Sequence, residues 1–223
     1  MPAEVEIVLA TGNPHKVAEI SAIFAHFVEP LIRVRGLPSL PGYPFPEPAE
    51  TGSTFEENAT IKAVAYARAI DRLCLADDSG LEVDALDGRP GVISSHFATG
   101  GVETGIDRAA RDAANTDRLL ADLAAIPPAR RAARYVCVMV LADASGVRAT
   151  SRGTLEGRIG TPPRVPAGGH GFGYDPVFLV GPSFTKTGAE LTPDEKSRSS
   201  HRAVACGRMA EHLARLFGAG PAR

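Results

Sequence analysis

The sequence predicts an α/β protein in which helices flank a mixed β-sheet. Short apolar runs typical of buried strands alternate with segments of helical periodicity, and Ala-Ser-Gly at residues 144–146 is a hairpin signal between two strand-like runs. Alternating strands and helices favour parallel strand pairs, whereas a hairpin requires an antiparallel pair. No repeat or low-complexity linker interrupts the 223 residues, so one domain over residues 1–223 is expected.

The first two strands are predicted at residues 5–10 and 31–35, with a helix between them. Asn13-Pro14 supplies an N-cap followed by proline at the first helical position, so this helix begins at once. Its apolar positions keep helical spacing at Val17, Ile20, Phe24 and Phe27. Residues 36–52 are rich in proline, which excludes a helix or a central strand there.

A capping box at Ser53–Glu56 opens a second helix, which is expected to reach Ile70. A strand that contains Cys74 then leads into a turn at Asp77-Asp78, and extended structure resumes over residues 81–86. The remaining predicted segments are a helix over 103–125, the hairpin strands 134–143 and 147–155, a glycine-dense turn at 168–173, a strand at 176–180, and a helix or helix pair from the capping box Thr192–Glu195 to Phe217.

The composition limits the classes of partner. A formal charge of -2 and a pI near 6.3 argue against a nucleic-acid polymer, whose binding needs a basic face. The longest apolar run, residues 135–142, is far below the ~20 residues of a spanning helix, so no membrane partner is expected. Three cysteines without a CxxC pair and an N-terminus without a signal-peptide pattern predict reduced thiols and a cytoplasmic location.

The first stretch that could take part in chemistry is ATGNPHK, residues 10–16. A strand, a short glycine-containing turn and a capped helix start bring several free N–H groups to one point. The helix dipole and Lys16 add positive potential, which is how proteins cradle phosphates. The Walker pattern GxxxxGK[ST] is absent, and the alternative is a plain strand-to-helix turn with Asn13 as cap and Lys16 in solvent.

The second stretch is ADDSG, where Asp77 and Asp78 follow an apolar run. Adjacent like charges at the end of a buried strand are costly to desolvate, which a divalent cation would offset. Glu50 is a candidate further ligand. The alternative is a turn built from ordinary turn residues. In the helix that follows the capping box, Asn58 and Lys62 are four residues apart and share a face. The slightly favoured interpretation is that this face is exposed to solvent.

The third stretch is GGHGFGYDPVF, residues 168–178, which crowds two aromatic residues and a carboxylate into one glycine-rich turn. Glycine permits the close approach of a ligand, and either Phe172 or Tyr174 can stack on a nucleobase. The alternative is a hairpin with aromatic core residues.

The fourth stretch is EKSRSSHR, residues 195–202, with Lys196, His201 and Arg202 near a predicted helix start. Cations there oppose the helix dipole, which indicates an anion or a base edge as partner. The other histidines show no HExxH or zinc spacing, and the nucleophile elbow GxSxG is absent.

Taken together in chain order, these stretches resemble the inosine triphosphate pyrophosphatase family, which removes inosine and xanthosine nucleoside triphosphates. The resemblance runs from about Ile7 to Arg202 and also includes ETGSTFEENATIKA and LADDSGLEVDALDGRPGV. It implies an elongated α/β fold of two lobes with the nucleotide in the cleft between them, a homodimer, a purine nucleoside triphosphate as substrate, and Mg²⁺ as cofactor.

The resemblance also implies roles for single residues. Asp78 would be the catalytic carboxylate and a metal ligand, Glu50 the second ligand, and Ser79 a substrate contact. The triphosphate would be lined by Thr11, Gly12, Asn13, Pro14, His15 and Lys16, with Lys16 clamping the departing phosphates. The base and sugar would be held by Phe172, Gly173, Tyr174, Asp175, Lys196, His201 and Arg202.

The sequence departs from this family in the length of the proline-rich loop before Glu50, which bears on the placement of Glu50, and at one motif. Bacterial members usually carry Ser-Ala-Arg-Tyr where this chain has Ser94-Ser95-His96-Phe97, and a histidine contacts phosphate more weakly than arginine at neutral pH. Two alternatives remain: a septum-inhibitor-like nucleotide pyrophosphatase acting on pyrimidine or methylated triphosphates, and a nucleotide-binding sensor without turnover.

Overall fold

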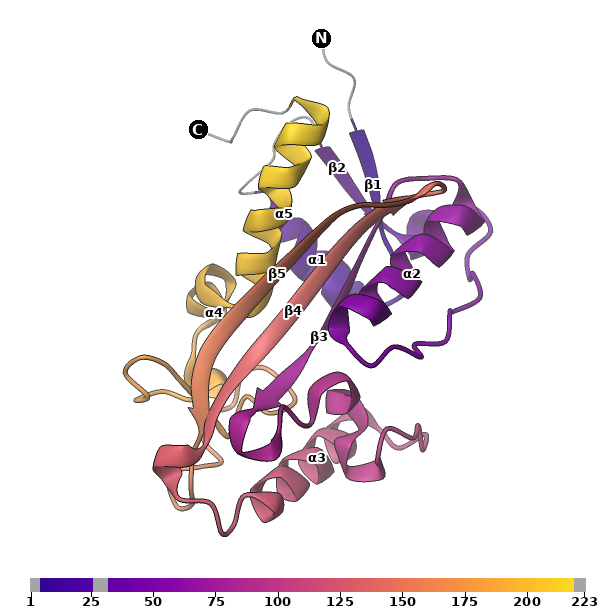
Figure 1. Cartoon of the computed structure of the whole chain (residues 1–223). Coiled ribbons are helices and arrows are strands. Elements are labelled where there is room, and N and C mark those ends of the chain that lie inside the picture. The colour runs from indigo at the N-terminus through magenta and orange to yellow at the C-terminus, as the bar shows by residue number, and fades with distance from the viewer. Residues whose placement is uncertain (1–4, 26–31, 219–223) are drawn as a thin grey trace. The chain divides into compact units, whose positions relative to one another are not determined.

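The computed structural model describes residues 5–25 and 32–218 and contains a mixed six-stranded sheet with flanking helices (Figure 1). The strand order is β2-β1-β3-β4-β5-β6. The strands are β1 Val5–Leu9, β2 Ile32–Gly36, β3 Cys74–Val83, β4 Ala132–Asp143, β5 Gly146–Ile159 and β6 Phe178–Val180. Strand β1 pairs in parallel with β2 and β3, whereas β5 and β6 are antiparallel. The predicted α/β class with a mixed sheet is therefore confirmed.

The α-helices begin where the sequence places caps. They are α1 Pro14–Ala25, α2 Phe55–Ile70, α3 Arg108–Asp122, α4 Pro193–Ser199 and α5 His201–Phe217. Thr192 and Glu195 form the predicted capping box of α4. Short 3₁₀ helices lie at Leu37–Ser39, Asp84–Leu86, Gly91–Thr99, Pro128–Arg130 and Gly188–Glu190. Among the described residues, no helix combines the length and apolar character needed to span a membrane.

The chain divides into two compact units, each built from separate segments. Unit 1 comprises Met1–Asp78, Cys137–Gly153 and Arg202–Arg223, and unit 2 comprises Ser79–Val136 and Thr154–His201. The chain passes from one unit to the other inside β3, β4 and β5 and at the start of α5, rather than in a linker. For that reason a change of composition cannot mark the division in the sequence.

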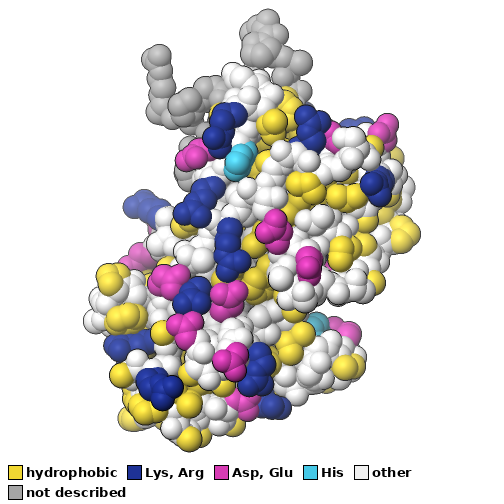
Figure 2. Space-filling model, in the orientation of Figure 1, with side chains coloured by type: hydrophobic (Ala, Val, Ile, Leu, Met, Phe, Trp, Pro, Cys, Tyr) yellow, Lys and Arg dark blue, Asp and Glu magenta, His cyan; other side chains and the backbone are white. Residues whose placement is uncertain are grey.

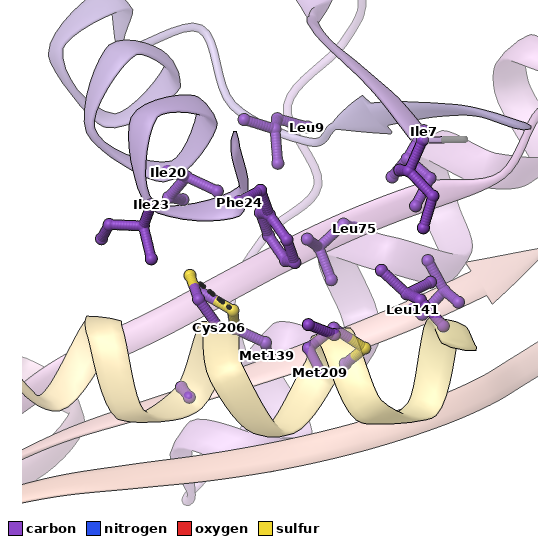
Figure 3. Close-up of a cluster of buried hydrophobic side chains, with 14 of the residues drawn as sticks. Ile7, Leu9, Ile20, Ile23, Phe24, Leu75, Met139, Leu141, Cys206 and Met209 are labelled. Carbon is purple, nitrogen blue, oxygen red and sulfur yellow. Dashed lines mark hydrogen bonds between the residues drawn. The ribbon is translucent and has the colours of Figure 1, made fainter. Parts of the chain in front are cut away.

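Each unit has its own apolar core. In unit 1, Ile20, Phe24 and their neighbours from α1 meet Cys206 and Met209 from α5 over the buried side chains of the strands (Figure 3). In unit 2, a second cluster includes Leu81, Leu119 and Phe178. All three cysteines are buried and free of disulfides, and burial raises the pKa of Cys74 and Cys137 to about 12. On the face drawn in Figure 2, acidic and basic side chains are interspersed.

Several predicted boundaries are wrong in detail. The capping box of α2 is formed by Thr54 and Glu57, one residue later than expected. Helix α3 begins only after Asp107 caps it, and β6 begins two residues late, at Phe178. Residues 84–86, expected to be extended, form a 3₁₀ turn. Phe27 of the first helical pattern and Leu31 of the second strand lie outside the described residues.

The largest correction concerns Asp77 and Asp78. The predicted turn does not exist, because β3 runs without interruption from Cys74 to Val83 and contains both aspartates. Local propensity favours a turn at Asp-Asp-Ser-Gly, but β3 lies between β1 and β4 in the sheet, and this pairing holds the segment extended.

Candidate active site

The two aspartates of β3 point in opposite directions, because successive side chains of a strand alternate between the faces of a sheet. Leu75 packs in the core cluster formed with α1 and α5, and Asp77, two residues later, pairs with Lys16 of α1 and Arg202 of α5. Asp78 instead lies 3.6 Å from the Nζ of Lys62, which belongs to α2. The two neighbours thus form their close ion pairs with different cations.

Asp77 is the centre of a buried ionic network. Lys16 Nζ lies 3.1 Å from both carboxylate oxygens of Asp77, and Arg202 Nη2 lies 3.5 Å from one of them. Arg202 Nη1 donates to both oxygens of Glu19 on α1, at 3.0 and 2.9 Å. Burial alone would raise the pKa of Asp77, but the charges of Lys16 and Arg202 hold it well below its usual value. Asp77 is therefore ionised throughout the neutral range.

Asp78 has different surroundings. Lys62 serves two carboxylates, since its Nζ is 3.1 Å from Glu50 and 3.6 Å from Asp78. Burial raises the pKa of Asp78 to about 6; Lys62 opposes this shift, and the charge of Glu50 adds to it. Burial would lower the pKa of Lys62, but Asp78, Asp77 and Glu50 raise it. The ionised form of Asp78 is thus less favourable here than in water, and a bound cation would reverse that.

The donor set fits a cation that is shared with a ligand. Among the described residues, no group of three or more histidine, cysteine or acidic side chains is arranged to hold a metal ion by itself. Mg²⁺ commonly binds through one or two carboxylates together with substrate phosphates and water, rather than in an all-protein cage. Asp78 and Glu50 both lie near the ammonium group of Lys62, so together they supply the two carboxylates of such a site.

The turn before α1 is fixed by an N-cap and by close packing at Gly12. Asn13 N donates to Thr11 Oγ1 at 3.1 Å, and the Asn13 side chain accepts from Lys16 N at 3.4 Å, so the helix is capped as predicted. A Cβ on Gly12 would lie only 2.8 Å from the Tyr43 hydroxyl, which explains the glycine. The side chains of Pro14 and His15 are not among those described.

The pair Asn58 and Lys62 was expected on a solvated face, and that expectation is wrong. Asn58 is 3% exposed and Lys62 8%. Asn58 Oδ1 accepts from Gly52 N at 2.8 Å, and a Cβ on Gly52 would clash with Glu57 and Asn58. Asn58 therefore fixes the end of the proline-rich loop, close in sequence to Glu50, while Lys62 holds the Glu50 carboxylate.

In unit 2, the glycine-rich loop is organised around Asp175. This carboxylate is 3% exposed and accepts from Phe172 N at 2.9 Å and from the ammonium group of Lys196. A Cβ on Gly171 would overlap the Asp175 carboxylate, so the loop closes tightly around it. The predicted neighbours Phe172, Asp175 and Lys196 are thus brought together.

The two aromatic residues of this loop differ in exposure. Tyr174 is 4% exposed, and its hydroxyl donates to the Ser94 carbonyl at 2.8 Å. Phe172 is 49% exposed, with the guanidinium of Arg108 4.5 Å from its ring centroid and the ammonium of Lys196 at 5.1 Å. Of the two, Phe172 is the ring available for stacking.

The cations of residues 195–202 are arranged differently from the prediction. Lys196 lies in the last turn of α4, where a cation is favoured by the dipole, and only His201 and Arg202 open α5. The His201 ring stacks on Tyr135 with centroids 5.1 Å apart and is 9% exposed. Ser79 follows Asp78 within β3.

Some contacting residues had no signal in the sequence. Glu19, Arg108 and Tyr135 meet their partners only through the fold, and Glu19 is 183 positions from Arg202. Lys62 had a weak signal, since it shares a helix face with Asn58. His96, where family members usually have arginine, lies 2.7 Å from Glu103 Oε2 and 3.3 Å from Arg111 Nη1.

The structure thus combines an α/β sheet, a carboxylate–ammonium cluster on strand β3 and a capped helix start, a set of groups that is able to hold an anionic ligand together with a cation. The family model of the Ham1 family matches residues 7–212, and the chain belongs to that family.

The relatives extend this likeness over nearly the full chain. A dITP/XTP pyrophosphatase of Exiguobacterium sibiricum is 45% identical, covering 96% of this chain and 99% of its own. The dITP/XTP pyrophosphatase of Bacillus subtilis is 41% identical, covering 93% of this chain and 96% of its own. Among solved structures, a HAM1 protein from Coxiella burnetii is similar with a TM-score of 0.80 at 36% identity, covering 95% of this chain and 99% of that one.

Proposed function

We propose that this protein hydrolyses non-standard purine nucleoside triphosphates, namely ITP, dITP and XTP, to the monophosphate and pyrophosphate in a Mg²⁺-dependent reaction. The names of two relatives support the substrate class, because those of Exiguobacterium sibiricum and Bacillus subtilis are dITP/XTP pyrophosphatases. The observation that carries the chemistry is the pair of carboxylates, Asp78 and Glu50, that share Lys62 in unit 1.

Asp78 and Glu50 are the residues that would hold Mg²⁺. When bound, the ion neutralises phosphate charge as it develops. Lys16, whose ammonium is held by Asp77 at 3.1 Å, and the N–H groups at the start of α1 bind the triphosphate. Asp77 keeps the Lys16 ammonium in place, which makes Asp77 a positioning residue.

Asp78 orients the attacking water and accepts its proton. The water oxygen forms a bond to the α-phosphorus, the bond to the bridging oxygen of the β-phosphate breaks, and pyrophosphate leaves with that oxygen. In the absence of a metal ion the pKa of Asp78 is about 6, and a bound cation would lower it, so Asp78 is in its ionised, proton-accepting form at neutral pH.

Phe172 and the residues proposed with it bind the base. Phe172 stacks on the purine, Asp175 and Lys196 fix the loop and contribute polar groups, and His201 and Tyr174 complete the set. Arg202 is a donor-only group that can pair with the 6-oxo group of hypoxanthine or xanthine but not with the 6-amino group of adenine. In this structure its Nη atoms contact Glu19 and Asp77. A homodimer in the cytoplasm, without nucleic-acid or membrane partners, completes the proposal.

Release of pyrophosphate tests the proposal. We expect kcat/KM for ITP, dITP and XTP to exceed that for ATP and GTP at least ~100-fold, equivalent to ~2.7 kcal/mol, with no turnover after chelation of Mg²⁺. Arg202→Ala should lower activity on ITP far more than on ATP. An equal loss of activity on both nucleotides would show that Arg202 acts only through its contacts with Asp77 and Glu19 and does not recognise the base.

The two alternatives give different results in the same assay. A septum-inhibitor-like enzyme would prefer pyrimidine or methylated triphosphates, and a sensor would bind ITP without releasing pyrophosphate. Comparable kcat/KM for ITP, GTP and ATP would leave only a general triphosphate hydrolase.

A further inference from the structure

The loop that carries Phe172 is rich in glycine and has little intrinsic preference for a single backbone conformation. Gly168, Gly171 and Gly173 have φ values of +91°, +82° and +60°, a region that suits glycine. Glycine-rich segments lose much conformational freedom on ordering, so a ligand that had to order this loop would bind weakly. The contacts that already order it are therefore of functional interest.

Two carboxylates hold the loop by its backbone. Asp175 belongs to the loop itself and accepts from Phe172 N. The second is Asp112 of α3, whose Oδ2 accepts from Gly173 N at 2.8 Å. This bond fixes the residue directly after Phe172 to a helix 61 positions earlier in the chain.

Arg108, one helical turn before Asp112, holds the ring. Its guanidinium carbon lies 4.5 Å from the centroid of Phe172, within the range of a cation–π contact. Its Nε lies 3.8 Å from the same Asp112 Oδ2 that accepts from Gly173. One carboxylate oxygen thus contacts both the loop backbone and the cation that covers the Phe172 ring, and all of these groups belong to unit 2.

We infer that Arg108 and Asp112 are positioning residues that order Phe172 for stacking on the base of the substrate. The inference rests on the proposed function, which assigns Phe172 to the base. Since the phosphate chemistry is carried by Lys16 and Asp78, loss of this ordering weakens binding of ground and transition state alike and raises KM with little change in kcat.

The first experiment measures kinetics with dITP. Asp112→Ala raises KM about tenfold, and Arg108→Ala about threefold, with kcat within about twofold in both. Asp112→Asn keeps an oxygen that accepts from Gly173 N, so it restores most of the lost affinity. Arg108 is 48% exposed, so its replacement is compatible with folding even where that of Asp112 is not.

The same helix supplies a matched control. Arg118 and Asp122 form a second i,i+4 pair on α3 with nearly the same exposure, 51% and 22% against 48% and 23%. Arg118 also lies over an aromatic ring, Phe97, at 5.7 Å. Arg118→Ala and Asp122→Ala remove comparable helix contacts but leave KM unchanged. Equal KM values for Arg108→Ala and Arg118→Ala overturn the inference.

A fluorescence experiment separates this inference from the proposed function. The chain has no tryptophan, so Phe172→Trp creates a single reporter, used in an Asp78→Asn background to prevent turnover. Titration with ITP and Mg²⁺ quenches this reporter, and adding Arg108→Ala or Asp112→Ala shifts the midpoint to higher ITP. Absence of quenching with ITP shown to bind by calorimetry refutes the base assignment itself. Quenching with unshifted midpoints refutes only the role of Arg108 and Asp112.

Discussion

On one face of β3, Asp77 lies between Lys16 and Arg202, whereas on the other face Asp78 shares Lys62 with Glu50. The first carboxylate has its pKa lowered and the second has its pKa raised to about 6, although they are adjacent in the chain. Charge pairing stabilises Asp77 in the ionised form. Asp78 retains the capacity to exchange a proton or to accept a cation, which is a property of catalytic carboxylates.

The largest effect should come from Asp78→Asn, which removes charge and proton acceptance with little change of shape. We expect turnover of ITP to fall by at least about 10³-fold, while nucleotide binding remains measurable by calorimetry. Asp77→Glu is a useful comparison, because it keeps the charge on the other face. Turnover of Asp78→Asn within tenfold of the parent would remove the catalytic assignment.

Lys16→Met should have the next largest effect on activity. The loss of one charge-assisted phosphate contact costs ~2–4 kcal/mol in kcat/KM. Because Lys16 also pairs with Asp77, a thermal unfolding curve must accompany the kinetics, and Glu19→Gln serves as a control that perturbs the same network from the Arg202 side. An unchanged kcat/KM would reduce Lys16 to a structural partner of Asp77.

The sequence was sufficient to predict what local chemistry encodes. The order of strands and helices, the Asn13 cap, the Thr192 capping box and the tight loop around Phe172 all follow from neighbouring residues. The sequence was not sufficient where pairing with neighbouring strands determines the conformation of a segment. Asp77 and Asp78 were expected to lie in a turn, but the continuous strand places their side chains on its two faces.

Long-range pairs were beyond prediction for a related reason. Glu19 and Arg202 have ordinary helical contexts, and only packing of α1 and α5 on the same core brings them together. Asn58 and Lys62 are polar residues at helical spacing, a pattern shared by solvated faces. Their burial depends on the loop that ends at Gly52, whose conformation no local motif specifies.

The two aspartates should also differ in their effect on stability. Asp77→Asn leaves Lys16 and Arg202 without their shared carboxylate, so the free energy of unfolding at pH 7 should fall by about 3–5 kcal/mol, as when one partner of a buried ion pair is removed. Because the folded-state pKa of Asp77 is depressed, its contribution is fully present above the ordinary pKa of 3.8 and is lost progressively as the pH falls from that value toward the depressed folded-state pKa. Urea titrations at pH 7 and at about pH 2 check this; equal losses at both would contradict it.

Asp78→Asn should raise the free energy of unfolding at neutral pH, by less than Asp77→Asn lowers it. A folded-state pKa of about 6, against the ordinary 3.8, means that ionised Asp78 costs about 2–3 kcal/mol of stability above pH 6. The groups that set this cost are Lys62 on α2, Glu50 in the proline-rich loop, and Lys16 and Asp77. The free energy of unfolding of the parent should therefore decline as the pH rises from about 4 to 6, whereas Asp78→Asn should lack this component.

Asp78→Asn should thus have a higher free energy of unfolding than the parent at pH 8 in the presence of EDTA. Below pH 4 the two proteins should be equally stable. Adding Mg²⁺ with nucleotide should stabilise the parent more than the variant, since the cation offsets the cost that the mutation removes. Urea unfolding at the three conditions provides the comparison. A destabilised Asp78→Asn at pH 8 would show that Lys62 fully compensates Asp78, and the electrostatic difference between the two faces of β3 would then no longer distinguish the catalytic carboxylate from the structural one.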